Sequence, residues 1–411
     1  MKAVVFTLGC KVNGSESDSL MRGLKDRGFE VSEKLEFADL YIVNTCAVTA
    51  EAERKSRQVV SRIKKINPNA QMIFTGCATQ KSPQSFYEKQ GVKLVTGVFS
   101  KGKILEMLDN SGICVMPETE VFEELLPAET VKARAYIKVQ DGCNNFCSYC
   151  IIPYLRGRTR SRNPINAVNE IEKLNPLESV INGINLSAYN FNGQGLVGLI
   201  NSLNSVNCRV RLGSLEVGVI TDEFLTALKG LKDFAEHFHL SLQSGSTEVL
   251  KKMNRRYTAK EFIDKVDLIR KYFPNAGITT DIIVGFPTET EDNFYETLEL
   301  VKRVKFSDAH CFPFSPRQGT VAYKMQDLSG DIKTERLNRL LKVKETLKKE
   351  FITANLNKIH EVIGEEIVEG YTVGYTGNYL RVYIKGDYTF RKIKVVLKES
   401  FKDGVLAEIG E

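Results

Sequence analysis

The stretch VQDGCNNFCSYCIIPYLRGR, residues Val139–Arg158, decides the fold. It starts at the end of a strand-like run and places three cysteines in the short loop that follows. Three residues separate Cys143 from Cys147, and two separate Cys147 from Cys150. Thiolates at this spacing suit iron–sulfur clusters or zinc. Either complete site takes four ligands, and no Cys or His follows nearby. We expect a four-iron cluster whose open iron binds another molecule; the alternative is a zinc loop with a distant fourth ligand.

Strand-like and helix-like segments alternate on both sides of this loop, from Ala133 to about Phe314. Six such units predict a partial (βα)6 barrel, whose chemistry lies at the C-terminal ends of its strands. Thr258 and Glu261 form a capping box that begins one of the helices. The expected strands are ARAYIKV, ESVINGI, CRVRLGSL, HFHLSLQ, ITTDIIVGF and AHCFPF.

The first ~110 residues also alternate between strand and helix patterns, which predicts an open parallel sheet with helices on its faces. The expected strands are KAVVFTL, DLYIVNTC, QMIFTGC and KLVTG, and the expected helices are residues 15–28, 50–66 and 101–108.

Three further cysteines each come at the end of one of these strands: Cys10, Cys46 and Cys77. Ligands of open parallel sheets bind at the carboxyl ends of the strands, so the three thiolates are expected to meet. They predict a second cluster with an open iron. The alternative is three unrelated core cysteines, since Cys is often buried. The remaining cysteines show no such pattern and are expected to be core or spare thiols: Cys114, Cys208 and Cys311.

The rest of the chain contains a linker and a third domain. Residues 117–130 are acidic and hold two prolines, which indicates a linker. Lys333–Leu356 reads as a long amphipathic helix. Short β-type runs with glycines then fill residues 362–409 and predict a small all-β barrel or sandwich. The predicted domains are residues 1–116, the linker 117–130, 131–357 and 358–411.

The composition indicates the kind of cellular compartment in which the protein is expected. The 411 residues carry a net charge of +6 and nine cysteines, an odd number that argues against a disulfide framework. The N-terminus lacks the layout of a signal peptide, and no apolar run approaches the roughly 20 residues that cross a bilayer. We therefore expect a cytoplasmic protein with no membrane association, in a compartment where clustered cysteines bind metal.

The three-cysteine loop with an aromatic residue before its last cysteine resembles the radical S-adenosylmethionine (SAM) superfamily. Motifs along nearly the whole chain resemble, more specifically, the methylthiotransferase family. They are TLGCKVN, NTCAVT, FTGC, GINLSAY, RLGSLE, HLSLQSGS, MNRRYT, TDIIVGFPTET and FPFSPRQGT, with the loop itself.

This resemblance implies an α/β protein with an N-terminal cluster domain, a radical SAM barrel and a C-terminal TRAM-like RNA-binding barrel. It implies two [4Fe-4S] clusters held by the six cysteines. It also implies that SAM serves as methyl donor at the first cluster and as radical source at the second. An electron donor and a sulfur source are further partners, and the oligomeric state stays open.

TLGCKVN and the cysteine loop are most similar to the branch that methylthiolates C2 of N6-threonylcarbamoyladenosine at position 37 of tRNA. An adenine C–H bond is not reactive by proton transfer alone, so such chemistry is delegated to cofactors. The alternatives are the isopentenyladenosine branch, the branch acting on a ribosomal protein and, in another class, a non-catalytic metal-containing RNA-binding protein.

Two groups of binding residues are predicted by position. The expected SAM contacts, at the rim of the barrel, are Tyr149, Gly183, Asn185, Ser214, Glu216, Gln243, Ser244, Asp281, Ile283 and Phe312. The expected RNA contacts, from basic stretches with interleaved aromatic residues in the tail, are Arg156, Arg158, Arg160, Arg381, Lys385, Arg391 and Lys392. The alternatives are capping and packing for the first group, and internal ion pairs for the second.

Overall fold

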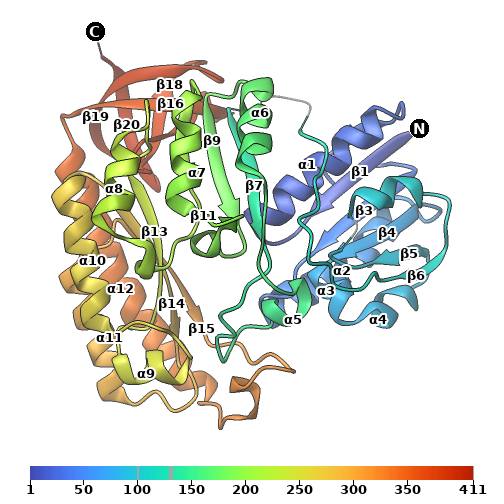
Figure 1. The fold of residues 1–411 in the computed structure, drawn as a ribbon, viewed down its shortest axis with the longest axis horizontal. Coiled ribbons are helices and arrows are strands. Elements are labelled where there is room, and N and C mark those ends of the chain that lie inside the picture. Colours follow the sequence, from blue (N-terminus) through green and yellow to red (C-terminus); the bar gives the residue numbers. More distant parts are fainter. Residues whose placement is uncertain (100, 129–132, 411) are drawn as a thin grey trace.

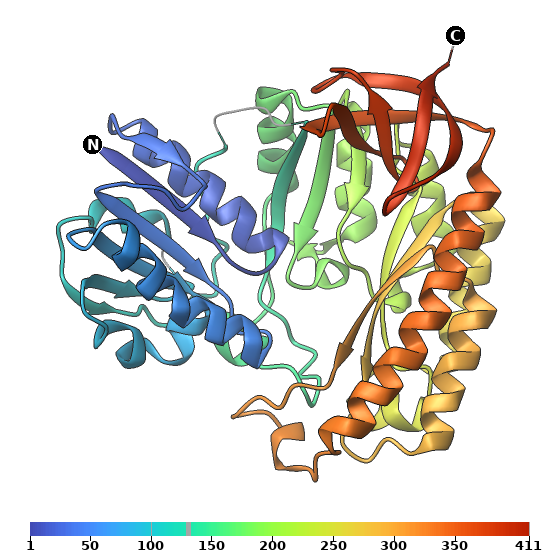
Figure 2. The ribbon, with the colours of Figure 1, turned by 180° about the vertical axis from the view of Figure 1, so that it is seen from behind.

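The computed structural model describes residues 1–99, 101–128 and 133–410, which form three packed bodies. Figures 1 and 2 show an N-terminal sheet domain beside a larger central half-barrel, with a small β-barrel lying across one end of the half-barrel. Residues 129–130 of the predicted linker and 131–132 of the predicted central domain lie outside the described residues. None of the described helices is long and apolar enough to cross a membrane.

The N-terminal domain is an open sheet of six parallel strands in the order β2-β1-β3-β4-β5-β6. All six residues of β3 are buried, because helices cover both faces of the sheet. Its strands are β1 (Lys2–Thr7), β2 (Glu30–Ser32), β3 (Leu40–Thr45), β4 (Gln71–Gly76), β5 (Val92–Thr96) and β6 (Gly112–Cys114). Its helices are α1 (Lys11–Lys25), α2 (Ala50–Ile66), α3 (Cys77–Lys81), α4 (Pro83–Tyr87) and the 3₁₀ helix η1 (Lys101–Glu106).

Two helices of this domain differ in the structure from what the sequence predicted. Helix α1 begins at Lys11 rather than Ser15, because Cys10 already occupies the extended N-cap position. Glu16 is therefore not in the first turn and is buried within the domain contact. The segment predicted as a helix at 101–108 is a short 3₁₀ turn. Helix α2 has the predicted bounds, and its N-cap Thr49 accepts a hydrogen bond from the Ala52 amide.

The central domain contains the six predicted parallel strands. Two sheets, β12-β9-β7-β8 and β13-β14-β15, are joined by isolated bridges such as Leu215–Leu240, which gives a partial barrel. The strands are β7 (Arg134–Asp141), β9 (Glu178–Gly183), β12 (Arg209–Leu212), β13 (His237–Gln243), β14 (Gly277–Val284) and β15 (Asp308–Pro313), with short strands β8 (Arg160–Ser161), β10 (Asn190–Phe191) and β11 (Gln194–Gly195).

Helices cover the outside of this half-barrel and pack against its apolar core (Figure 1). The predicted capping box of Thr258 and Glu261 is present, and Thr290 caps the next helix with Asn293. The helices are α5 (Ile152–Arg156), α6 (Pro164–Leu174), α7 (Leu196–Ser202), α8 (Asp222–Lys229), α9 (Thr247–Lys252), α10 (Ala259–Tyr272), α11 (Glu291–Val304) and α12 (Gly330–Asn355), with 3₁₀ turns η2 (Leu186–Ala188), η3 (Leu203–Ser205), η4 (Val217–Val219) and η5 (Ala322–Lys324).

The C-terminal domain is a closed barrel in the order β16-β17-β18-β20-β19. The barrel, one of the two predicted forms, leaves no sheet edge unpaired. It docks on the central domain through Arg211, which donates to the Thr376 and Gly377 carbonyls, and through a stack of Tyr379 on His237. Its strands are β16 (Ile359–Val368), β17 (Tyr371–Thr376), β18 (Arg381–Lys385), β19 (Lys392–Phe401) and β20 (Gly404–Ile409).

Candidate metal-cluster site

The first three cysteines meet at the carboxyl edge of the N-terminal sheet, as the strand ends predicted. Cys10 precedes α1, Cys46 directly follows β3, and Cys77 is the first residue of α3. A Cβ placed on Gly9 would lie 2.9 Å from the Cβ of Cys46, so the chain before Cys10 passes directly over this thiol. Gly9 also has a φ of +107°, which favours glycine.

The second set lies in the loop between β7 and α5, which turns sharply at Phe146 with a φ of +47°. The Cys150 amide donates to the Cys147 carbonyl at 2.9 Å, and the Cys143 amide donates to the Gly157 carbonyl at 3.0 Å. These bonds fold the loop back on itself, so that, besides the larger effect of burial, Cys147 and Cys143 lie near enough to Cys150 to raise its pKa.

One cavity of about 830 Å³ joins the two sets. It is lined by Cys10, Cys46 and Cys77 on one side and by Cys143 and Cys150 on the other, and it extends to the C-terminal barrel. A second cavity of about 570 Å³, between α1 and the linker, contains none of the cysteines. Five of the six cysteines of the two sets therefore line the large cavity, and Cys147 is buried outside its lining.

Among the described residues, three side chains donate hydrogen bonds to sulfurs of the two cysteine sets. Arg156 Nε lies 3.4 Å from Cys77 Sγ, and Arg255 Nη1 lies 3.4 Å from Cys147 Sγ. Asn185 Nδ2 lies 3.7 Å from Cys143 Sγ. Donors of this kind orient cluster ligands and adjust the reduction potential of a cluster. Neither arginine was predicted in this role, because each lies far along the chain from the cysteine that it contacts.

Burial makes the thiols of Cys46 and Cys150 poor anions without a cation beside them. Burial, with the nearby Cys77 and Cys10, raises the pKa of Cys46 to about 11, and burial raises the pKa of Cys150 to about 12. Bound iron reverses this preference, because a coordinated thiol is deprotonated. Among the described residues, no three His, Cys, Asp or Glu side chains converge tightly enough to share one ion. Each protein ligand of a four-iron cluster binds its own iron, and thiolates are the usual ligands, so the chemistry of the two cysteine sets suits such clusters.

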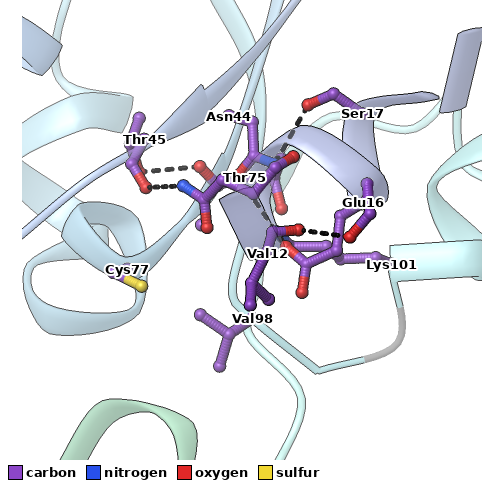
Figure 3. Close-up of polar contacts among 12 residues, drawn as sticks. Val12, Glu16, Ser17, Asn44, Thr45, Thr75, Cys77, Val98 and Lys101 are labelled. Carbon is purple, nitrogen blue, oxygen red and sulfur yellow. Dashed lines mark hydrogen bonds and ion pairs between the residues drawn. The ribbon is translucent and has the colours of Figure 1, made fainter. Parts of the chain in front are cut away.

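A buried network of charges lies behind Cys77, between the N-terminal and central domains. Glu16 of α1 pairs with Lys101 of η1, and Lys101 also donates to Asn44 Oδ1 at 2.9 Å (Figure 3). Arg156 donates to Glu16 at 2.9 Å and to Asp141 at 3.1 Å. Lys101 and Arg156 hold the pKa of Glu16 well below its usual range, although burial alone would raise it. The network therefore stays ionised and ties the two domains together.

This network corrects two RNA predictions. Arg156 is 0% exposed, because its guanidinium is enclosed by Glu16, Asp141, Asn13 and the Cys77 thiol. Arg160 is also buried and donates to the carbonyls of Arg156 and Arg158. Their alternation along an extended segment was the basis of the prediction, but both side chains turn inward to satisfy buried acceptors.

Contacts across the domain boundary also occur outside the network. Glu53 of α2 pairs with Arg317 from the segment after β15 and with Lys81 of α3. Burial acts to raise the pKa of Glu53, but hydrogen bonds from these cations lower it to about 2. The sheet edge that bears the cysteines is thus fixed to the rim of the half-barrel from two sides.

The predicted SAM contacts fall into three groups. Four line the cavity: Gly183, Ser214, Asp281 and Phe312. Asn185 contacts Cys143, and Glu216 accepts from Asn145 of the loop at 2.6 Å. Tyr149 and Ile283 both pack against one small apolar cluster. Gln243 is buried with a φ of +67°. Ser244 is 0% exposed, and its hydroxyl meets the Ser246 amide and Thr297, so its predicted contact with a cofactor is wrong.

The remaining predicted RNA residues lie nearer the surface. Arg158 is exposed and stacks on Phe146 at 4.6 Å. Arg381 pairs with Asp403, and Lys392 pairs with Asp233 and Glu361. Lys385 and Arg391 are exposed, and neither has an ion-pair partner within the described part of the chain.

A six-stranded half-barrel with a three-cysteine loop after its first strand defines the radical SAM class of enzymes, which bind a [4Fe-4S] cluster and SAM. Residues 137–301 match the radical SAM superfamily, and residues 2–97 match a family described as uncharacterized protein family UPF0004. A radical SAM methyltransferase from Kitasatospora setae has a similar fold, with a TM-score of 0.55 at 15% identity over 75% of this chain and 72% of its own.

Relatives extend over almost the entire sequence. The chain is 37% identical to the threonylcarbamoyladenosine tRNA methylthiotransferase of Bacillus subtilis, over 98% of this chain and 95% of that protein. The corresponding enzyme of Thermotoga maritima is 35% identical over 99% and 97%. A tRNA-2-methylthio-N(6)-dimethylallyladenosine synthase of Clostridium novyi is 36% identical over 82% and 79%. The chain belongs to the radical SAM methylthiotransferase family.

Proposed function

We propose that this enzyme transfers a methylthio group to C2 of N6-threonylcarbamoyladenosine at position 37 of tRNA. The observation that carries the proposal is the single cavity lined by both cysteine sets. Sulfur held on one side and a radical generated on the other would act on one adenine placed between them. The Bacillus subtilis and Thermotoga maritima relatives bear the name of this activity, which favours threonylcarbamoyladenosine over the dimethylallyl nucleoside.

Two clusters follow from the two incomplete cysteine sets. Cys143, Cys147 and Cys150 would hold the cluster that binds and cleaves SAM, and Cys10, Cys46 and Cys77 would hold the second cluster. When bound, these groups supply the radical and the methylthio sulfur, which no side chain of the protein can provide. Each of the two clusters would keep one iron without a protein ligand, because three thiolates bind only three of its four irons.

The protein itself contributes placement and shielding. Arg156, Arg255 and Asn185 hydrogen-bond the ligand sulfurs and hold them in position. Gly183 and Ser214, at the ends of neighbouring strands, line the wall on which SAM would lie. A cavity of this size has room for a nucleoside, and a bound base would displace water from it, which protects a radical from side reactions.

The RNA backbone would be held outside the cavity. Arg158 beside the cysteine loop and Lys385 and Arg391 on the C-terminal barrel are the exposed cations that we assign to phosphate contacts. A cytoplasmic location, an external electron donor and a sulfur source belong to the same proposal, since tRNA and reduced clusters require them.

The test uses anaerobically reconstituted enzyme and two alanine variants. The wild type is expected to bind about eight irons, the content of two four-iron clusters. Cys147→Ala is expected to form no 5′-deoxyadenosine, whereas Cys46→Ala is expected to cleave SAM but transfer no methylthio group. Cys208→Ala, a buried cysteine away from the cavity, is the control and should retain both reactions.

Several results would refute parts of the proposal. Loss of SAM cleavage in both variants despite a loaded loop cluster would refute the division of labour. Stoichiometric zinc without SAM cleavage would favour a non-catalytic RNA-binding protein. Mass spectrometry of tRNA nucleosides from a deletion strain identifies the substrate: loss of the 2-methylthio derivative of threonylcarbamoyladenosine is expected, and loss of the isopentenyl counterpart would overturn this choice.

A further inference from the structure

Lys11 places a cation in the cavity next to a cysteine of the first set. It is the first residue of α1, directly after Cys10, and its side chain is exposed to the cavity that both cysteine sets line. The N-terminus of a 15-residue helix adds partial positive charge at the same point.

The other lysine and arginine side chains that line this cavity already have carboxylate partners. Arg156 is paired with Glu16 and Asp141, Lys348 with Asp308, and Arg381 with Asp403. Lys11 forms no hydrogen bond or ion pair with any side chain in the described parts of the structure. It is therefore the cavity cation that has a site free for an anionic group.

The charges around Lys11 do not supply such a partner. Arg211 and Arg134 act on its ammonium group as like charges, and Glu178 and Asp281 act as opposite charges. Glu178 is held by Arg211 and Arg134, and Asp281 accepts from His239 at 3.2 Å. The two carboxylates that act on Lys11 are thus already engaged by other side chains, which leaves the Lys11 ammonium group free to bind an anion from outside.

The two substrate types named for the relatives differ in this property. The N6-threonylcarbamoyl group ends in a carboxylate, whereas a dimethylallyl group is uncharged. C2 and C6 flank N1 of adenine, and C6 bears the N6 substituent, so a base whose C2 faces the Cys10 set also turns that substituent towards the same wall. A flexible lysine next to Cys10 is well placed to reach that substituent.

We propose that Lys11 binds the carboxylate of the N6-threonylcarbamoyl group and thereby selects this nucleoside over uncharged N6 substituents. This inference rests on the proposed function, because it assumes that the base enters the cavity between the two cysteine sets.

The test measures binding of anticodon stem-loop RNA to the reconstituted enzyme. Three RNAs are compared, with threonylcarbamoyladenosine, its methyl ester or unmodified adenosine at position 37. The wild type should bind the acid roughly 10- to 100-fold more tightly than the ester, the range for a hydrogen bond to a charged group. Lys11→Gln should bind the acid and the ester equally, and Lys11→Arg should recover part of the preference.

Lys348→Gln is the matched control, because it removes one positive charge from the same cavity while its partner Asp308 remains. It should change the affinities for acid and ester by the same factor. Iron content and the electron paramagnetic resonance spectrum of Lys11→Gln should match the wild type. Altered cluster signals with unchanged acid preference would instead assign Lys11 to the cluster and overturn the inference.

Equal affinities of the wild-type enzyme for the acid and the ester would also overturn the inference, and this comparison needs no substitution. Failure of the proposed function gives a different result, because wild-type enzyme would then leave threonylcarbamoyladenosine tRNA unmodified in a complete reaction.

Discussion

Replacement of Arg156 by methionine tests whether the buried charge network holds the N-terminal domain against the half-barrel. The guanidinium donates to Glu16, Asp141, Asn13 and Cys77 and is completely buried. Removing one partner of a buried ion pair costs about 3–5 kcal/mol, because the remaining charge is left uncompensated. Lys101 and Lys138 still face Glu16 in the variant, so we expect the lower end, about 3 kcal/mol.

The assay is native-state hydrogen exchange of the metal-free protein, which reports stability element by element. A loss of about 3 kcal/mol corresponds to exchange about 100-fold faster in α1 and α5. The control is Arg158→Met, two residues away, whose exposed side chain only stacks on Phe146 and is worth about 0.5–1 kcal/mol. Equal exchange rates in the two variants would refute the role of the network.

Three further predictions concern the cysteine edge, pH and RNA. Gly9→Ala should displace the adjoining Cys46 thiol and lower the iron content at the first cysteine set. The control is Gly14→Ala, which has open space around it in α1 and should stabilise the helix by about 0.5–1 kcal/mol. Equal iron contents in the two variants would contradict this prediction. The pKa of Glu53 is lowered to about 2, so its stabilising contribution is complete above the unfolded pKa of about 4.3 and is lost as pH falls through 2. Urea unfolding should therefore give Glu53→Gln a lower free energy of unfolding than the wild type at pH 6, and this difference should narrow below pH 4. A difference that does not change with pH would disprove the link between Glu53 ionisation and stability. Replacing Lys385 and Arg391 together by glutamine should reduce the slope of log affinity against log salt by about 1.4–1.8, as for two lost phosphate contacts. An unchanged slope would exclude phosphate contacts by these two residues.

Much of the architecture was predictable because it depends on local patterns. Alternating strand and helix segments identified the six barrel strands, the bounds of α2 and the C-terminal barrel. The strand ends also identified the cysteines that line the cavity, since parallel strands finish at one edge. The start of α1 was missed, because a cysteine at the N-cap is not one of the usual capping residues.

What the sequence alone determined is the presence of two cysteine sets, each one ligand short of four. Short spacing and strand-end position are properties of the chain, and they do not depend on which domains pack together. The tertiary structure decided which side chains surround those thiols. Arg156 turns inward to Glu16 of another domain, and Arg255 reaches Cys147 across more than a hundred residues. The orientation of each charge follows from its buried partners, and these are known only once the domains are packed.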